Sequence, residues 1–124
     1  MTLDVIEWGT RPKVGKGYGA DVDGKWCSFL ETKKGAYRGD HTHPYDQYTV
    51  LLGGSARVVK LVDGELVEHL LRENVVHVTP KGVAHILVPD EDVVLYEWWD
   101  GPYEADPCPG VFDMYKKNRV GPRD

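Results

Sequence analysis

The sequence predicts an all-β domain whose strands pack as a sandwich or a barrel. Its 124 residues include 14 glycines and 8 prolines, which divide the chain into short segments. These segments are rich in valine, leucine and tyrosine, and no amphipathic helix of any length lies between them. Many short strands joined by frequent turns are typical of sandwiches and barrels.

Turn signals mark where the expected strands end. Gly53-Gly54 indicates a turn, and Asp63-Gly64 is typical of a two-residue hairpin. Pro80 ends an apolar run, because proline has no amide hydrogen to donate to a sheet. The strands expected between these signals are residues 26–32, 48–52, 55–62, 65–71, 75–79, 83–88 and 93–99.

The length of the chain suits one domain, residues 1–124, with a single core. Residues 26–99 are expected to form the barrel body. The glycine-rich residues 1–25 are expected to be a loose arm or an added edge strand. Residues 100–124 contain four prolines and are expected to be an extended tail that crosses the barrel or a partner subunit, with a short helical turn within 112–117.

The charge distribution weighs against a nucleic-acid partner. The net charge is -5, and no basic run stands out, whereas nucleic-acid-binding proteins usually present a basic face. No signal peptide is visible and no apolar stretch approaches about 18 residues, so we expect a cytoplasmic protein that enters no membrane. Cys27 and Cys108 belong to no Cys-x-x-Cys pair and are expected to be free thiols.

Two histidines two residues apart, His41 and His43, are the first chemical signal. In an extended strand, residues i and i+2 point to the same face, so the two imidazoles converge as a transition metal requires. Gln47 has the same parity, although Pro44 interrupts the alternation and indicates a bulge or strand edge. A third imidazole, His85, enters a strand after the turn at residues 80–82 and would complete a mononuclear site.

The first of these segments resembles the first sequence motif of the cupin superfamily. In that motif His-x-His is followed by three residues, a Glu and later a Gly; here the matching residues are His41, His43, Gln47 and Gly53 or Gly54. The second cupin motif, Pro-x-Gly followed by two residues and a His, is matched at every anchor by residues 80–85. The resemblance covers residues 35–99.

This resemblance implies a cupin β-barrel, a jelly roll of two packed antiparallel sheets. It also implies one divalent first-row transition metal, which would be zinc, nickel, manganese or iron. The implied ligands are His41, His43, Gln47 and His85.

The chain departs from the cupin pattern at two positions. Asn74 stands where a glycine usually opens the second motif, and asparagine tolerates the left-handed backbone that such a position requires. Gln47 stands where glutamate is usual. Three imidazoles and an amide cancel none of the metal's charge, so the site should be a strong Lewis acid that attracts an anionic ligand and holds its metal less tightly.

A finer resemblance concerns the residues around the first motif. Arg38-Gly39 before the histidines resembles cupins that act on nucleotide-linked sugars, in several of which the paired histidines work without a metal. Trp99, Tyr103 and Asp106 resemble the end of such domains faintly. A sugar-acid-converting cupin with a His, His, Gln, His site is another relative that this ligand set resembles.

Several other side chains are open to either a functional or a structural interpretation. Arg38 and Arg57 suit an anion as its binding partners, but a solvated surface role is at least as simple. Tyr96 is expected to contact substrate, although plain packing would also account for it. His69 and His77 match no motif anchor and are expected to be ordinary strand residues. The adjacent Trp98 and Trp99 should face opposite ways, one of them into the core or pocket.

The preferred hypothesis is a mononuclear metal enzyme acting on a small oxygenated organic anion, such as a sugar or sugar acid, by isomerase, epimerase or lyase chemistry. His41, His43 and His85 would carry the reaction. The alternatives are an iron-dependent dioxygenase, a metal-free sugar-nucleotide isomerase or epimerase, and a ligand-binding module without turnover. An aromatic-rich barrel edge favours a homodimer.

Overall fold

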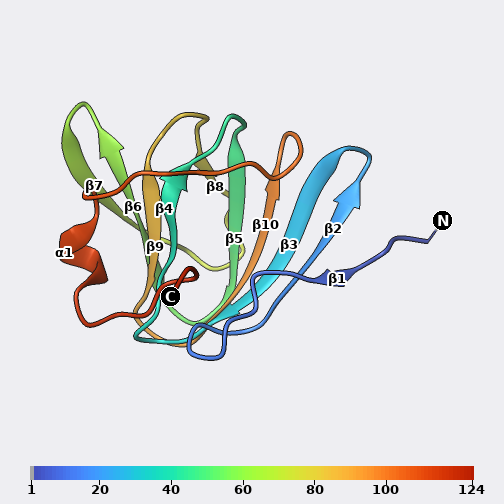
Figure 1. Ribbon diagram of the computed structural model, residues 1–124, viewed down its shortest axis with the longest axis horizontal. Helices are drawn as coiled ribbons and strands as arrows, with labels where there is room; N and C mark the ends of the chain where they lie inside the picture. The colour runs from blue at the N-terminus through green and yellow to red at the C-terminus, as the bar shows by residue number, and fades with distance from the viewer. Residues whose placement is uncertain (1) are drawn as a thin grey trace.

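The computed structural model describes residues 2–124, which form two antiparallel sheets packed face to face (Figure 1). The six-stranded sheet has the order β1-β2-β3-β10-β5-β8. Its strands are β1 (Ile6–Glu7), β2 (Gly17–Val22), β3 (Lys25–Thr32), β10 (Val93–Trp99), β5 (Gln47–Gly53) and β8 (His77–Thr79).

The second sheet has five strands in the order β11-β4-β9-β6-β7. It carries the two segments that contain the histidines of interest, because β4 pairs with β9. The strands are β11 (Asp106–Pro107), β4 (Arg38–Thr42), β9 (His85–Pro89), β6 (Ala56–Val62) and β7 (Glu65–Leu70). The all-β fold of two packed sheets expected from the sequence is therefore confirmed.

The main core lies between the two sheets, and strand alternation explains its composition. Leu95 and Val93 on β10 face inward, and Val58 on β6 meets them from the other sheet. The next residue of β6, Val59, points to the opposite face and belongs to a second cluster. That cluster contains Tyr37, Val59, Ala84, Ile86, Val88 and Phe112.

The C-terminal segment covers this second cluster. It leaves β10, pairs with β4 through β11, forms the helix α1 (Asp113–Lys116) and then returns along the five-stranded sheet (Figure 1). Phe112 is fully buried and anchors the segment on the outer face of the sheet. A tail that crosses the barrel, with one helical turn inside 112–117, is what the structure shows.

Four strands, β1, β2, β4 and β11, lie outside the ranges expected from the sequence, and of these β1 and β2 match the alternative of an edge strand added by residues 1–25. β2 contains Gly17 and Gly19, which break the apolar alternation; at Gly19 a Cβ atom would clash with the Trp26 ring, so the position needs glycine. In β4, Gly39 and Asp40 have φ angles of 87° and 65°, which is left-handed backbone inside a strand. The expected strand 75–79 is shorter than predicted, since β8 begins at His77.

Other local expectations are met. Asn74 has a φ angle of 62°, the left-handed conformation expected where the cupin motif has glycine. Cys27 and Cys108 are free thiols. Among residues 2–124, no helix is long and apolar enough to cross a membrane.

Candidate metal centre

Three histidines from two neighbouring strands meet inside the barrel. His41 lies on β4 directly opposite His85 on β9, and His43 follows just after the end of β4. One ring nitrogen from each histidine lies within 4.8 Å of the others. The ring centroids are 4.3 Å apart for His41 and His43, and 5.0 Å apart for His41 and His85. This spacing allows one ion to contact all three rings.

A β-bulge places His41 in this position. The pairing of β4 with β9 shifts register between Gly39 and His41, where Gly39 and Asp40 adopt positive φ angles. A Cβ atom at Gly39 would lie 3.1 Å from the carbonyl oxygen of His85, so the two strands approach closely there. Bulges of this kind re-aim side chains, and here the bulge directs His41 toward His85.

Backbone carbonyls determine which ring nitrogens face the centre. Nδ1 of His43 donates a hydrogen bond to the carbonyl oxygen of Glu104 at 2.7 Å, and Nδ1 of His85 donates to that of Val83 at 2.9 Å. Because a carbonyl only accepts, both Nδ1 atoms carry the proton and both Nε2 atoms keep a lone pair. Both Nε2 atoms are buried and have no hydrogen-bond partner among the described residues. Imidazoles held in this way are typical of metal ligands.

Gln47 completes the donor set from the other sheet. Its Nε2 atom donates to Glu97 Oε2 at 2.5 Å, and its Oε1 atom is buried without a partner in the described chain. A buried, unpaired acceptor beside unpaired imidazoles is costly unless a cation satisfies it. Three nitrogens and one amide oxygen are suitable ligands for a divalent first-row metal. The residues therefore fit the metal that the sequence predicts.

Burial keeps the three imidazoles neutral, the state that binds metal. Desolvation is the main cause and lowers the pKa of His41 to about 2, with further contributions from His85, His43 and Arg123. Desolvation likewise lowers the pKa of His85 to about 4. It also lowers the pKa of His43, against the opposing effect of its hydrogen bond to Glu104.

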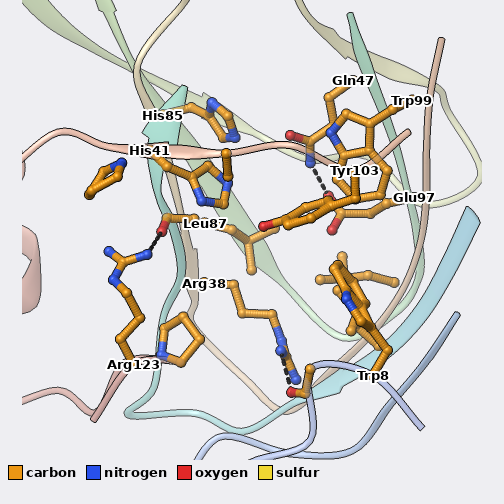
Figure 2. Close-up of a pocket in the computed structure, with 17 residues that line it drawn as sticks. Trp8, Arg38, His41, Gln47, His85, Leu87, Glu97, Trp99, Tyr103 and Arg123 are labelled. Carbon is orange, nitrogen blue, oxygen red and sulfur yellow. Dashed lines mark hydrogen bonds between the residues drawn. The ribbon is translucent and has the colours of Figure 1, made fainter. Parts of the chain in front are cut away.

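A cavity of about 300 Å³ opens beside the centre. Figure 2 shows His41, His85 and Gln47 toward one end and Arg38 with Trp8 toward the other. Polar and apolar side chains both line this cavity. The apolar residues of the wall are Trp8, Leu30, Leu87, Leu95, Trp99, Ala105, Pro107 and Pro122.

Arg38 lies in the cavity wall, as its proposed role in binding an anion requires. It is buried, and its guanidinium donates to Thr32 Oγ1 at 2.7 Å and to the carbonyl oxygens of Gly9 and Glu31. Burial lowers its pKa to about 10, so the group keeps its charge at neutral pH. These bonds fix the position of the guanidinium in the cavity wall.

Arg57 and Tyr96 do not lie at the cavity, which corrects their assignment to substrate binding there. The Arg57 guanidinium pairs with Asp90 at 2.9 Å and Glu68 at 3.1 Å on the outer face of β6, since its neighbour Val58 faces the core. Tyr96 lies on the outer face of β10, because Leu95 and Glu97 beside it point inward. Both were chosen for residue type, and strand parity excludes them.

The remaining sequence expectations concern two tryptophans and two further histidines. Trp99 is buried and lines the cavity, whereas Trp98 stacks on Tyr48 at 5.1 Å on the outer face, so the two do face opposite ways. His69 and His77 lie on β7 and β8 with their rings 5.4 Å apart, away from the three-histidine cluster.

Sequence reasoning missed three polar groups of the cavity: Glu97, Arg123, and Tyr103 as a lining residue. Glu97 had a detectable signal, because it is a lone charge in the most apolar strand and shares parity with Leu95 and Trp99. Arg123 lies at the far end of the tail and reaches the cavity only through the return of that segment. No local pattern marks it.

Structural comparison assigns the architecture. Oxalate decarboxylase of Bacillus subtilis, in a deletion mutant, matches with a TM-score of 0.73 and 19% identity over 84% of this chain and 30% of that one. CapF in complex with an inhibitor matches with a TM-score of 0.67 and 18% identity over 82% of this chain and 31% of that one. The chain has the cupin fold. No protein-family model matches the sequence, and no curated protein does.

The cupin fold explains why two motifs that are far apart in sequence form one site. The first motif supplies His41, His43 and Gln47, and the second supplies His85 from the strand paired with β4. The chain spans less than a third of the length of the structures it matches. The match therefore describes the fold of this domain.

Proposed function

We propose that the protein is a mononuclear metal enzyme that acts on a small oxygenated organic anion. The observation that carries the proposal is the set of unpaired ligand atoms: Nε2 of His43, Nε2 of His85 and Oε1 of Gln47 are all buried without partners in residues 2–124. His41 lies within reach of the same point. A divalent ion would satisfy all four side chains at once.

The charges around the cavity favour an anionic substrate. A divalent metal bound by His41, His43, His85 and Gln47 would act as a Lewis acid on a carbonyl or enediolate oxygen. Arg38 and Arg123 add two guanidinium groups to the same cavity wall, and Arg123 also pairs with the Asp40 carboxylate at 3.0 Å. Guanidinium groups pair with carboxylates through fixed, forked donors. The chain would thus hold an anion between its metal ligands and these two arginines.

The size and lining of the cavity favour a compact molecule. A volume of about 300 Å³ is at the lower end of the range for ligand pockets. A sugar acid or a similar small carboxylate suits that space, whereas a nucleotide-linked sugar would fit only by one end. The name oxalate decarboxylase describes a protein of this fold that acts on a small dicarboxylate. This supports the substrate class, and isomerase, epimerase or lyase chemistry is the reaction type we propose.

Tyr103 is the pocket residue we propose as a hydrogen-bond donor to the bound anion. Its ring lies 5.4 Å from that of His43 and 5.2 Å from that of Trp99, and its side chain lines the cavity (Figure 2). Burial raises the pKa of Tyr103 to about 12, so the hydroxyl stays protonated at neutral pH. A protonated hydroxyl there would donate to an oxygen of the bound anion.

Elemental analysis of the purified protein tests the metal half of the proposal. We expect one equivalent of a first-row metal in the protein and none in His41→Ala. His69→Ala, which removes a histidine outside the cluster, should keep the metal. If the protein takes up no metal even after reconstitution, the proposal falls. Bound ferrous ion with oxygen consumption would instead indicate a dioxygenase.

A further inference from the structure

A buried carboxylate lies directly behind Gln47. Glu97 is on β10, which pairs with β5, and its register partner is Thr49. Both side chains and that of Gln47 point into the barrel interior and are buried. Glu97 Oε2 accepts hydrogen bonds from Gln47 Nε2 at 2.5 Å and from Thr49 Oγ1 at 2.7 Å, as the dashed line in Figure 2 shows for the first of these.

This contact determines the orientation of the Gln47 amide. An amide has a donor end and an acceptor end of nearly equal size, so packing alone does not select between its two orientations. With Nε2 toward Glu97, the amide donates to a carboxylate, and Oε1 is left unpaired among the histidines. The reverse orientation would place Oε1 against the carboxylate oxygen and present N–H groups to the imidazoles. Two acceptors facing each other in a buried site are strongly unfavourable.

We propose that Glu97 is a positioning residue for the metal centre, holding the Gln47 amide so that Oε1 and not Nε2 faces His41, His43 and His85. The assignment rests on the metal site proposed above and adds a role for a residue that does not itself reach the metal. Outer residues that orient a ligand in this way are a general feature of metal sites.

Glu97 also explains why the site works with an amide ligand. The Glu97 carboxylate contacts Gln47 and does not itself reach the metal. Its hydrogen bond to Nε2 polarises the amide, so that Oε1 carries more negative charge. A glutamate at position 47 would instead bring two carboxyl groups into contact, and two buried carboxylates so close repel each other. Gln47 and Glu97 therefore form a matched pair, in which each residue type depends on the other.

A double-mutant cycle on this pair tests the proposal. The proteins are the unaltered chain, Glu97→Gln, Gln47→Glu and the reciprocal Gln47→Glu/Glu97→Gln. Glu31→Gln serves as the control, since it removes the same charge from an exposed side chain on the neighbouring strand β3. Zn²⁺ affinity is measured for each by competition with a chromophoric chelator, and thermal melting shows that each variant is folded.

The expected result is a reversal of sign. With Gln47 present, Glu97→Gln should weaken Zn²⁺ binding about 10- to 100-fold, because the amide loses the partner that orients it. In the Gln47→Glu background, the same replacement should strengthen binding, because it removes a repelling carboxylate and supplies a donor. Glu31→Gln should leave affinity unchanged. If Glu97 only stabilises the fold, Glu97→Gln should change Zn²⁺ affinity in the same direction with Gln47 and with Gln47→Glu. That outcome would overturn the assignment.

A second readout needs no metal. In the unaltered chain, the side-chain amide protons of Gln47 should exchange slowly with solvent by NMR, and in Glu97→Gln they should exchange faster. Unchanged Zn²⁺ affinity and unchanged exchange in Glu97→Gln would overturn this inference alone. Failure of the unaltered chain to bind Zn²⁺ would remove the metal centre itself, and the positioning role with it.

Discussion

The carbonyl oxygen of Glu104 accepts a 2.7 Å hydrogen bond from Nδ1 of His43. Glu104 belongs to the C-terminal segment, so a part of the chain far from the motif aims one of its imidazoles. The same segment returns to Asp40, next to His41, where Lys116 and Arg123 each lie 3.0 Å from the Asp40 carboxylate. The C-terminal segment therefore supports the metal centre beside both histidines of the first motif.

Asp40→Asn should weaken the attachment of the C-terminal segment to β4 without disturbing the β-bulge. Asparagine tolerates the φ angle of 65° at this position, but it removes the charge that pairs with Lys116 and Arg123. The carboxylate is buried and its partners are partly exposed, so we expect a loss of about 1–3 kcal/mol in the free energy of unfolding. Urea denaturation measures it. Asp113→Asn, which removes an exposed partner of Lys116 at 4.0 Å, should cost far less.

Phe112→Ala should destabilise the segment from its apolar side. The Phe112 ring is fully buried against the outer face of the five-stranded sheet, with Val59 and Ile86 in the same cluster. Truncating a buried phenylalanine costs about 3–5 kcal/mol. Thermal unfolding of the variant should show that loss, together with weaker Zn²⁺ binding, since the carbonyl of Glu104 is carried by the same segment. A melting temperature equal to that of the unaltered chain would contradict the anchoring role.

Stability without metal should fall as the pH drops from about 6.5 toward 4. Burial lowers the pKa of His77 and of His85 to about 4 in the folded chain, below the value of about 6.5 in the unfolded chain. Between these values the unfolded state binds protons that the folded state does not, so protonation favours unfolding. The stabilising contribution is thus complete above pH 6.5 and declines below it.

Urea midpoints of the metal-free protein across this pH range measure the effect. His77→Gln should flatten the dependence, because the replacement does not titrate. Added Zn²⁺ should move the loss of stability to lower pH by holding His85 unprotonated. A midpoint that stays constant from pH 6.5 to 4 would show that these histidines are not held neutral by the fold.

The sequence predicted the cluster of candidate ligands better than it predicted the residues around it. His41, His43, Gln47 and His85 could be found because parity on a strand and the spacing of two motifs are local properties. Arg123 and Glu104 could not, because they reach the site through the return path of the C-terminal segment. Such contacts depend on tertiary packing, which leaves no periodic trace in the sequence.

The errors have other, more local origins. Arg57 was favoured by residue type, yet it shares parity with Val59 and not with the inward-facing Val58, which places it outside the barrel, where Asp90 and Glu68 neutralise it. The strand β4 was missed because left-handed residues at Gly39 and Asp40 break its alternation. The bulge that hid this strand from pattern analysis is the feature that aims His41. Local irregularity of this kind is common beside functional sites.

The homodimer expected from the sequence stays a prediction, and the outer face of the six-stranded sheet is where we expect it to form. Tyr18, Phe29 and Tyr96 are register neighbours across β2, β3 and β10, with exposed fractions of 42%, 41% and 36%. Trp98 stacks on Tyr48 in the adjacent row of the same face. A continuous aromatic surface of this kind is unusual on a monomer and favours association.

Analytical ultracentrifugation should therefore give the mass of a dimer for the unaltered chain. Trp98→Glu places a charge in the middle of the aromatic face and should yield a monomer that still melts cooperatively. Met114→Glu adds the same charge on α1, at a side chain that is 72% exposed on another part of the surface, and should leave the dimer intact. If the unaltered chain sediments as a monomer at high micromolar concentration, the aromatic face does not join two copies of this chain. If both variants dissociate, net charge and not this face controls the association.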